Sequence, residues 1–413
     1  MKFAVLCPHF APDTAPTGVV MTRIVHELAA LDHELHVVTA LPWYREHRIE
    51  AGWEVHGWRD WIRREDVPWG SITRVHPFPG DDKRNLLRRA AGFAGFSALA
   101  GLASLRGGRV DAVIAMSPPL TMGLTGWGTH LVRRGPLVFN IQDVFPDAAV
   151  STGAITDRRI IAVARWLERV SYHRAAAVTV LSDDLRDNVA AKVKAAARSR
   201  VHVIPNFVDT EAIHPLDRRT AYRTELGIGD EPVVMYAGNV GFSQSLELLI
   251  DAARELPDVV FVVNGDGAAR AHLETLASTC TNVRFAGYQP VERLPEVLAS
   301  ADLHVVPLRA GLGNVSVPSK TYSILAAARP VLAAIDPDTE VPRMLAASGG
   351  GWAVPPDDPT AFVGTLRELV DSPAQLAAAG ARGRAWIEHA ASPQAVARAY
   401  EVLARSLRGP SDR

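Results

Sequence analysis

The sequence predicts an α/β protein with two Rossmann-like domains, each a doubly wound parallel sheet. Strand-like apolar runs alternate with helically spaced apolar residues almost from end to end. The runs are continuously apolar, as in parallel sheets that helices cover on both faces. The 413 residues also suffice for two domains, each with a full core. We therefore expect two similar sheets with their ligand crevice beyond the carboxyl ends of the strands.

The first half contains five strand-like runs, and the first two are separated by a helical pattern. The runs are 2–8, 34–40, 111–117, 137–143 and 176–182. Between the first two, Val20, Ile24 and Leu28 recur at helical spacing. This order predicts a β-α series of about 200 residues, roughly one Rossmann-like domain.

The second half repeats the pattern after a break at 201–216, where a strand runs into Pro, Asn and Asp turn residues. Its strand-like runs are 233–239, 259–267, 282–288, 302–308 and 330–335. A last helix near 393–407 carries Val396, Tyr400 and Leu403 on one face, which suits a return to the first domain. The predicted domains are 1–205 completed by 391–413, and 206–390.

Composition excludes several classes of function. Lys and Arg total 44 against 45 Asp and Glu, so no basic excess indicates a nucleic-acid partner. Cys7 and Cys280 match no metal or redox spacing, and no persuasive metal cluster is present. The start MKFAVLCPHF predicts a strand rather than a secretory signal, and no apolar run reaches the ~20 residues of a membrane span. We expect a cytoplasmic protein.

The segment 83–109 has basic residues at both ends of a run of small and apolar residues. Such a helix can lie on an anionic membrane surface, which would make the protein peripheral on the inner face of the plasma membrane. The same pattern also suits a core helix with solvated ends. Both readings remain open from the sequence.

Nucleotide chemistry is expected at the strand ends of the second half, although two common signatures are absent. No Gly-x-Gly-x-x-Gly follows a strand, and no Gly-x4-Gly-Lys-Ser/Thr is present, which disfavours a dehydrogenase or a P-loop NTPase. Polar residues and glycines follow the strands instead. They are Asn239, Gly241 and Gln244 after the first, Gly265 after the second and Tyr288 after the third.

The helix predicted at 320–328 begins with a cation, at the end of the helix dipole that favours anions. Ser319 is a natural N-cap for it, and Lys320 is its first residue. Arg309, at the end of the preceding strand, could converge with Lys320 on one anion that faces the free N–H groups of the helix. A bound phosphate would explain the position of Lys320; a solvated surface lysine is the alternative.

Six segments resemble the retaining glycosyltransferases of family four, which have the GT-B fold. They are FNIQDVFPDAAV (139–150), LERVSYHRAAAVTVLSDDLRDNV (167–189), VIPNFVDTEAIHPL (203–216), YAGNVGFSQSL (236–246), VPSKTYSILAAARPVL (317–332) and GGGWAVPPDDPTA (349–361). Several are similar to one branch, the proposed N-acetyl-L-fucosaminyl transferases of O-antigen and colanic-acid assembly. The likeness covers nearly the whole chain in the right order.

The resemblance implies a nucleoside-diphosphate sugar bound by the second domain, an acceptor bound by the first, and transfer of a hexose-type sugar with retention across a central cleft. It implies no metal and no further cofactor. The acceptor would be a lipid-linked or glycan intermediate of cell-surface polysaccharide or glycolipid synthesis. The donor site would include Thr321 beside Lys320 and Ser319.

The chain departs from the family pattern at several positions. Val315 and Ser323 stand where the wider family has two glutamates, one for the donor sugar and one for the ribose. The Ser323 hydroxyl could still bond a ribose, and Glu340 is our candidate for the lost carboxylate contact. The usual basic pair after the first strand of the second domain is replaced by Asn239 and Gln244.

In the first domain, Asp143 ends an apolar strand, where a charge is costly unless it is used or paired. It could orient or deprotonate an acceptor hydroxyl, or cap the turn before Pro146. Its neighbour Gln142 replaces a histidine common in the family. Gly18 is expected to let the backbone approach the donor phosphates, and His9 either lines the site or is structural.

Five tryptophans crowd the segment after the second strand: Trp43, Trp53, Trp58, Trp61 and Trp69. They stack on a sugar, lie at a membrane interface or pack within a long loop. Two other functions fit the same architecture. One is a sugar-nucleotide epimerase, and the other is a non-catalytic nucleotide-sugar-binding assembly partner, suggested by the missing glutamates.

Overall fold

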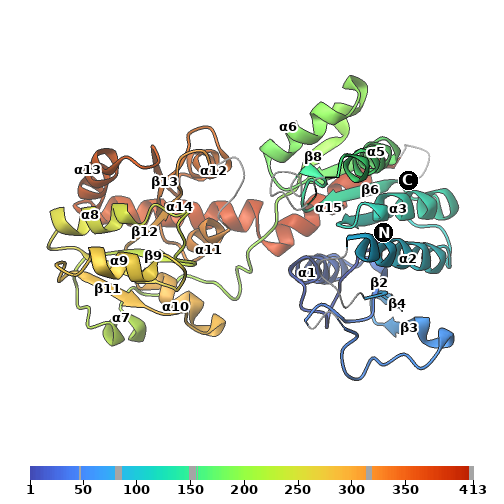
Figure 1. Cartoon of the computed structure of the whole chain (residues 1–413), viewed down its shortest axis with the longest axis horizontal. Helices are drawn as coiled ribbons and strands as arrows, with labels where there is room; N and C mark the ends of the chain where they lie inside the picture. Colours follow the sequence, from blue (N-terminus) through green and yellow to red (C-terminus); the bar gives the residue numbers. More distant parts are fainter. Residues whose placement is uncertain (46–47, 80–85, 148–154, 156, 313–318, 409–413) are drawn as a thin grey trace. The chain divides into compact units, whose positions relative to one another are not determined.

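The computed structural model describes residues 1–45, 48–79, 86–147, 155, 157–312 and 319–408, with the side chains of 86–90 left aside. The chain forms two compact units (Figure 1). Unit 1 comprises 1–206 and 396–413, and unit 2 comprises 207–395. These limits differ from those expected by one residue at the first crossing and five at the second.

Unit 1 holds an eight-stranded sheet in the order β3-β4-β2-β1-β5-β6-β7-β8. Its strands are β1 (Lys2–Leu6), β2 (Glu34–Ala40), β3 (Ile62–Val67), β4 (Gly70–Val75), β5 (Ala112–Ser117), β6 (Leu137–Ile141), β7 (Ala177–Val180) and β8 (Val201–Val203). All neighbours are parallel except β3 and β4, which form an antiparallel pair. The first five strand-like runs of the sequence all form strands of this sheet.

The antiparallel pair corrects the sequence reading, in which no strand was expected between 41 and 79. Four of the six residues of β3, IRREDV, are charged and none is fully buried, because β3 is the edge strand of the sheet. An edge strand shows no continuous apolar run, so the pattern that revealed the other strands is missing here. Four of the five tryptophans of this segment pack on neighbouring groups: Trp43 on His9, Trp53 on Arg74, Trp61 on His76 and Phe78, and Trp69 on Phe10 and His26. Trp58 is 74% exposed.

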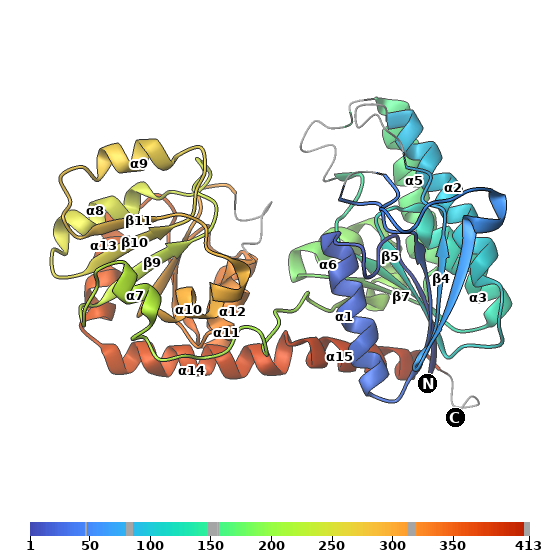
Figure 2. The same ribbon diagram turned by 90° about the horizontal axis from the view of Figure 1, so that it is seen from below.

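Helices cover both faces of the unit 1 sheet. They are α1 (Pro16–Ala30), η1 (Trp58–Trp61), α2 (Leu86–Ser104), α3 (Thr121–Arg133), α5 (Arg158–Arg174), α6 (Asp183–Lys192), η2 (Ala195–Arg200) and α15 (Pro393–Leu407). Helices α2, α3 and α5 lie side by side on one face, and α1 lies on the other (Figure 2). The first group shares a buried apolar cluster that includes Phe96, Met122 and Tyr172.

Helix α15 returns the C-terminal part of the chain to unit 1. The buried Tyr400 hydroxyl accepts a hydrogen bond from Asn140 Nδ2 at 2.7 Å and lies 3.3 Å from the Thr179 hydroxyl. Val396 and Leu403 are buried on the same face of the helix. The expected return of this helix is confirmed.

Unit 2 holds a six-stranded, fully parallel sheet in the order β11-β10-β9-β12-β13-β14. Its strands are β9 (Val233–Ala237), β10 (Val260–Asn264), β11 (Val283–Ala286), β12 (Leu303–Pro307), β13 (Val331–Ala334) and β14 (Gly351–Val354). Its helices are α7 (Ala221–Glu225), α8 (Glu247–Glu255), α9 (Arg270–Leu276), η3 (Val291–Arg293), α10 (Leu294–Ala299), α11 (Lys320–Ala326), α12 (Glu340–Ser348), α13 (Pro359–Val370) and α14 (Pro373–Ala390). The sequence predicted five of these strands and missed β14.

Helix α11 is shorter than the predicted 320–328. It ends at Ala326 because Ala328 adopts a left-handed backbone conformation with φ 54°, just before Pro330. Ser319 does not cap the helix as predicted: its dihedral angles are already helical and its side chain makes no capping hydrogen bond. The first turn of α11 lies at the carboxyl edge of the sheet, where Lys320 contacts Tyr236 at the end of β9.

Within the residues that the structure describes, no helix is long and apolar enough to cross a bilayer. The two parallel sheets, with helices on both faces, confirm the predicted fold class.

Candidate active site

The loops after β9 and β10 in unit 2 pack backbone against backbone. Gly238, Gly265 and Gly267 have φ angles of 142°, 146° and 155°, which side chains rarely tolerate. A Cβ on Gly265 would lie 1.9 Å from the Gly238 carbonyl oxygen, and one on Gly267 would lie 2.3 Å from the Val240 oxygen. These glycines build a side-chain-free floor at the carboxyl edge of the sheet. Packing against Gly238 alone requires a glycine at 265, and its contact with a donor stays a prediction.

Lys320 reaches this floor from the start of α11. Its Nζ lies 3.8 Å from the centroid of the Tyr236 ring, and a Cβ on Gly238 would approach it to 2.9 Å. In the described part of the chain, no hydrogen bond or carboxylate partner reaches this Nζ. Burial lowers the pKa of Lys320 from 10.5 to about 7. In the free protein, the charged form of this half-buried amine is therefore destabilised by desolvation, and a bound anion would offset that destabilisation.

Arg309 does not share this state, because two carboxylates already lie beside it. Its convergence with Lys320 on one anion stays a prediction. Its Nη2 lies 2.8 Å from a Glu247 carboxylate oxygen and its Nη1 lies 3.6 Å from one of Asp357. Its Nε donates to the Phe242 carbonyl at 2.7 Å. The two carboxylates already match the guanidinium charge, so Arg309 joins the loop after β12 to the loop after β9 and the start of α8.

The loop after β9 forms a compact turn through its own polar groups. The Gly241 N–H donates to Gln244 Oε1 at 3.0 Å, and the Tyr236 hydroxyl donates to the Asn239 carbonyl. The Asn239 side chain is exposed and Gln244 is half-buried. Both are amides, so this loop presents hydrogen-bonding groups without charge, and their contact with a donor stays a prediction.

Tyr288 follows β11 and is 60% exposed. Its hydroxyl donates to the Asp266 carbonyl at 3.2 Å, which ties the ring to the loop after β10. An exposed aromatic ring at the strand edge suits stacking on a nucleotide base. The Tyr288 ring is therefore accessible to a ligand, and its contact with a base stays a prediction.

The first turn of α11 places the remaining predicted donor residues around Lys320. Thr321 is fully buried, and among the described residues nothing hydrogen-bonds its hydroxyl. Ser319 is exposed and Ser323 is half-buried. Val315 lies outside the described residues. The orphaned Thr321 hydroxyl is a feature that the sequence could not indicate.

Glu340, the candidate for the lost carboxylate contact, begins helix α12. Its carboxylate lies 3.3 Å from Arg343 Nη2, one helical turn away. Burial, with a contribution from Glu340, raises the pKa of Tyr322 in α11 to about 12. Glu340 therefore faces α11 but is already engaged with a cation.

The carboxyl edge of the unit 1 sheet is built from side chains that bond one another. Gln142, 7% exposed, donates to Asn140 Oδ1 at 2.8 Å and accepts from Asn206 Nδ2 at 3.0 Å. Asp143 beside it is exposed, and among described residues its carboxylate has no hydrogen-bond or ion-pair partner. Gln142 thus has a structural role, while Asp143 remains available to a ligand.

His9 and Asp13 form a pair at the same edge, after β1. His9 Nδ1 lies 2.7 Å from Asp13 Oδ2, and the imidazole stacks on Trp43 at 5.6 Å between centroids. Asp13 was missed, because the turn at residues 11 and 12 that brings it back to His9 leaves no periodic pattern in the sequence. Gly18 lies in the first turn of α1, where a Cβ would meet His9 Cβ at 2.7 Å. Packing against His9 therefore explains Gly18 without any ligand.

No group of three or more His, Cys, Asp or Glu residues in the described ranges could hold a metal ion. The segment Asp336-Pro337-Asp338 is a turn, and both carboxylate oxygens of Asp336 lie 2.9 Å from the Gly311 N–H.

Comparison with known families matches both halves of the chain. A family model described as a glycosyl transferase 4-like domain matches residues 17–206, and one described as glycosyl transferases group 1 matches 231–372. The chain belongs to the GT-B glycosyltransferases. The resemblance seen in the sequence is confirmed at this level.

Relatives and solved structures agree with this assignment. The putative colanic acid biosynthesis glycosyl transferase WcaI of Escherichia coli is 27% identical over 387 residues, covering 90% of this chain and 92% of that protein. The structure of sucrose-phosphate synthase from Thermosynechococcus elongatus has a TM-score of 0.64 and 18% identity, covering 98% of this chain and 99% of that one. Anabaena HepE in complex with UDP and glucose has a TM-score of 0.60 and 15% identity, covering 98% and 100%.

Proposed function

We propose that this glycosyltransferase moves a hexose-type sugar, with retention of configuration, from a nucleoside-diphosphate sugar to an acceptor in cell-surface polysaccharide or glycolipid synthesis. The observation that carries the proposal is Lys320, an amine held at the unit 2 strand edge over a floor of glycines. The similarity to WcaI supports the biosynthetic role, and the UDP and glucose complex of HepE supports the class of donor.

Departure of the nucleoside diphosphate is the step that most needs help, because negative charge develops on the leaving oxygen. Protonated Lys320 is placed to neutralise that charge, and its contact would replace the solvation that burial removes. The glycine floor lets a diphosphate approach the backbone closely. No metal or other cofactor is proposed for this step.

Unit 2 is the proposed donor-binding unit. Tyr288 would stack on the base, and the Thr321 hydroxyl would gain the partner it lacks in the described chain. Ser323 or Glu340 would bond the ribose or the sugar, although Glu340 must first be shared with Arg343. The remaining proposed contacts are Asn239, Gly241, Gln244, Gly265 and Ser319.

Unit 1 is the proposed acceptor-binding unit, with Asp143 orienting or deprotonating the acceptor hydroxyl. Its exposure and its lack of a partner in the described chain support this role. We expect Asp143→Asn to lose at least ~10-fold in transfer while donor affinity is retained. Calorimetry that shows lost donor affinity instead would remove Asp143 from the acceptor side.

A lipid-linked acceptor would place the enzyme at the inner face of the plasma membrane, with segment 83–109 on the lipid. Helix α2 occupies most of this segment and buries Phe96, Ala100 and Ala103, while Leu102 is 59% exposed. The basic side chains at the start of the segment lie outside those described. Helix α2 thus packs in the core along one side, and we propose that its exposed side meets the lipid.

The direct test is a thermal-shift panel of nucleoside diphosphates and nucleotide sugars, followed by a transfer assay with the best donor and a membrane extract as acceptor. We expect a stabilising nucleoside diphosphate and acceptor-dependent product that retains the donor's anomeric configuration. Isomerised nucleotide sugar without acceptor would indicate an epimerase. Binding without turnover would indicate a non-catalytic partner.

A further inference from the structure

The helical layer formed by α2, α3 and α5 has a charge balance unlike that of the whole chain. These three helices contain eight arginines and one acidic residue, whereas the chain has 44 basic and 45 acidic residues. The single acid, Glu168, is buried and lies 2.7 Å from Lys192 Nζ. Arg133 of α3 is buried, whereas the five arginines of α5 are exposed, so α5 turns arginines, and no carboxylate of its own, towards solvent.

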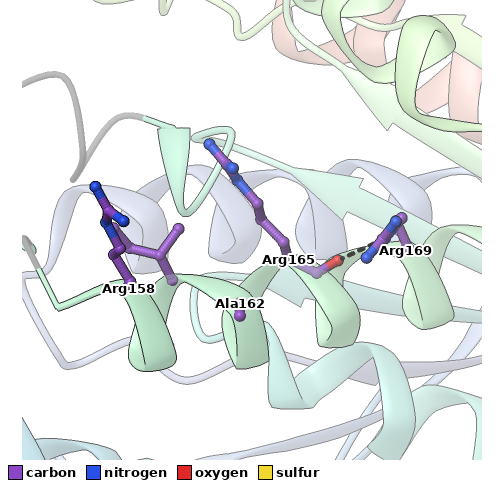
Figure 3. A pocket seen from close by; sticks show the side chains of 5 residues that line it. Arg158, Ala162, Arg165 and Arg169 are labelled. Carbon is purple, nitrogen blue, oxygen red and sulfur yellow. Dashed lines mark hydrogen bonds between the residues drawn. The ribbon is translucent and has the colours of Figure 1, made fainter.

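Helix α5 concentrates this charge in one stripe. Arg158, Ala162, Arg165 and Arg169 follow one another at helical spacing, and the three arginine side chains rise from the same side of the helix (Figure 3). They line an open hollow of about 480 Å³ over Ala162. Arg169 Nε donates to the Arg165 carbonyl, and no carboxylate among the described residues pairs with any of the three. The stripe thus offers unpaired guanidinium groups beside a recess.

An apolar stripe runs beside the basic one. Val163 is 64% exposed and Trp166 is 56% exposed, and both lie next to the arginines on the outward side of α5. Val163 and Trp166 cannot pack on the sheet, because the face of α5 that points to the sheet is formed by Ala164, Glu168 and Tyr172. Exposed Trp and Val beside arginines are unfavourable in water but suit a boundary between water and lipid.

We propose that the outer face of α5 docks on an anionic lipid bilayer. The helix would lie parallel to the surface, with Arg158, Arg165 and Arg169 on lipid phosphates and Val163 and Trp166 among the upper acyl carbons. Charge complementarity selects an anionic surface, and the neighbouring apolar stripe selects lipid over nucleic acid. The arginines and apolar side chains that carry this proposal belong to α5 and not to segment 83–109.

The docking rests on the proposed function for its purpose, which is to bring unit 1 to a lipid-linked acceptor. Its test does not depend on that function, because vesicle binding requires neither a donor nor turnover. A protein that binds vesicles but transfers no sugar would refute the function alone. A transferase that ignores vesicles would refute the docking alone.

The experiment is flotation of the full chain with phosphatidylglycerol vesicles and with phosphatidylcholine vesicles. We expect the wild type to float only with the anionic vesicles, and to be released by high salt. R158Q/R165Q/R169Q should reduce the partition coefficient about 100-fold, since each arginine near the surface contributes roughly fivefold. V163S/W166S should reduce it about 10-fold without changing the salt dependence.

Matched control variants separate this face from a general charge or hydrophobic effect. R59Q/R198Q/R398Q removes three exposed arginines elsewhere in unit 1, and V291S/V402S removes two apolar side chains that are 73% and 65% exposed. Both should float like the wild type. Equal losses in control and α5 variants, or no binding to phosphatidylglycerol, would overturn the proposal. A dimer in light scattering that R158Q/R165Q/R169Q abolishes would assign the face to a second copy instead.

Discussion

The carboxyl edges of the two sheets are built in opposite ways. In unit 2 the edge is backbone: Gly238, Gly265 and Gly267 hold the loops together, and Lys320 stands over them without a counter-charge in the described chain. In unit 1 the edge is side chains, since Gln142 bonds to Asn140 and Asn206. The unit 2 edge therefore holds an amine without a counter-charge in the described chain, while at the unit 1 edge Gln142 already has its hydrogen-bond partners.

This difference indicates where ligand binding changes the protein most. An anion at the unit 2 edge would relieve the desolvation of an amine, so donor binding should be strongly coupled to charge and protonation. At the unit 1 edge Gln142 is already bonded on both sides, so an acceptor would meet a preformed network with one available carboxylate, Asp143. Three substitutions and one pH dependence test this contrast between the two edges.

The glycine floor should be the least tolerant feature. Gly265→Ala places a Cβ 1.9 Å from a backbone oxygen at a φ of 146°, and we expect about 3–5 kcal/mol of destabilisation in denaturant unfolding. Gly227→Ala is the matched control, because its φ is 65° and no atom lies within 4 Å of the added Cβ. It should cost about 1 kcal/mol. Similar losses in both would mean that the two loops need no close backbone contact.

Lys320 should matter for transfer and not for folding. Lys320→Met keeps the apolar stem over Tyr236 and removes a charge that burial disfavours, so we expect unchanged or higher stability. Transfer should fall at least ~100-fold, because the leaving diphosphate loses its cation. Lys194→Met, at an exposed position in unit 1, should leave both unchanged. Near wild-type turnover in Lys320→Met would exclude Lys320 from the mechanism.

The unit 1 network should show the reverse behaviour. Gln142→Leu leaves Asn140 and Asn206 each without one hydrogen bond, and we expect about 1–3 kcal/mol of lost stability. Donor affinity measured by calorimetry should not change. A variant as stable as the wild type, with weaker donor binding, would place Gln142 in the donor site instead.

The fold was largely predictable because buried parallel strands are recognisable in the sequence as continuous apolar runs. Runs such as the buried β10 are continuously apolar, and the observed strands begin and end within two or three residues of the predicted runs. The antiparallel strand β3 escaped because an edge strand with IRREDV shows neither an apolar run nor a clear alternation. Long helices with one apolar face, such as α15, were equally plain.

The candidate residues were predictable in position and not in pairing. Strand ends placed Lys320 and Asp143 at the carboxyl edges of their sheets, as in the structure, since parallel strands bring their loops together, while their roles stay predictions. Nothing in the sequence shows that Arg309 meets Glu247 at the start of α8 and Asp357 after β14, since both lie far from it along the chain. Spacing finds candidate charges, but only the folded chain shows which of them are neutralised.

The smallest effect, and the most specific to the contrast, is a pH dependence that comes from Lys320. Its pKa is about 7 in the folded chain against 10.5 when unfolded, so between these values the unfolded state binds more protons. Stability of the free protein should therefore rise with pH across this window, by at most about 1.4 kcal/mol per pH unit, and fall as pH drops towards 7. Subtracting the profile of Lys320→Met cancels all other titrating groups.

Calorimetry of nucleoside-diphosphate binding near pH 8, in buffers with different ionisation enthalpies, should show uptake of up to about one proton, absent in Lys320→Met. Binding without proton uptake would mean that the amine is already charged or does not meet the anion.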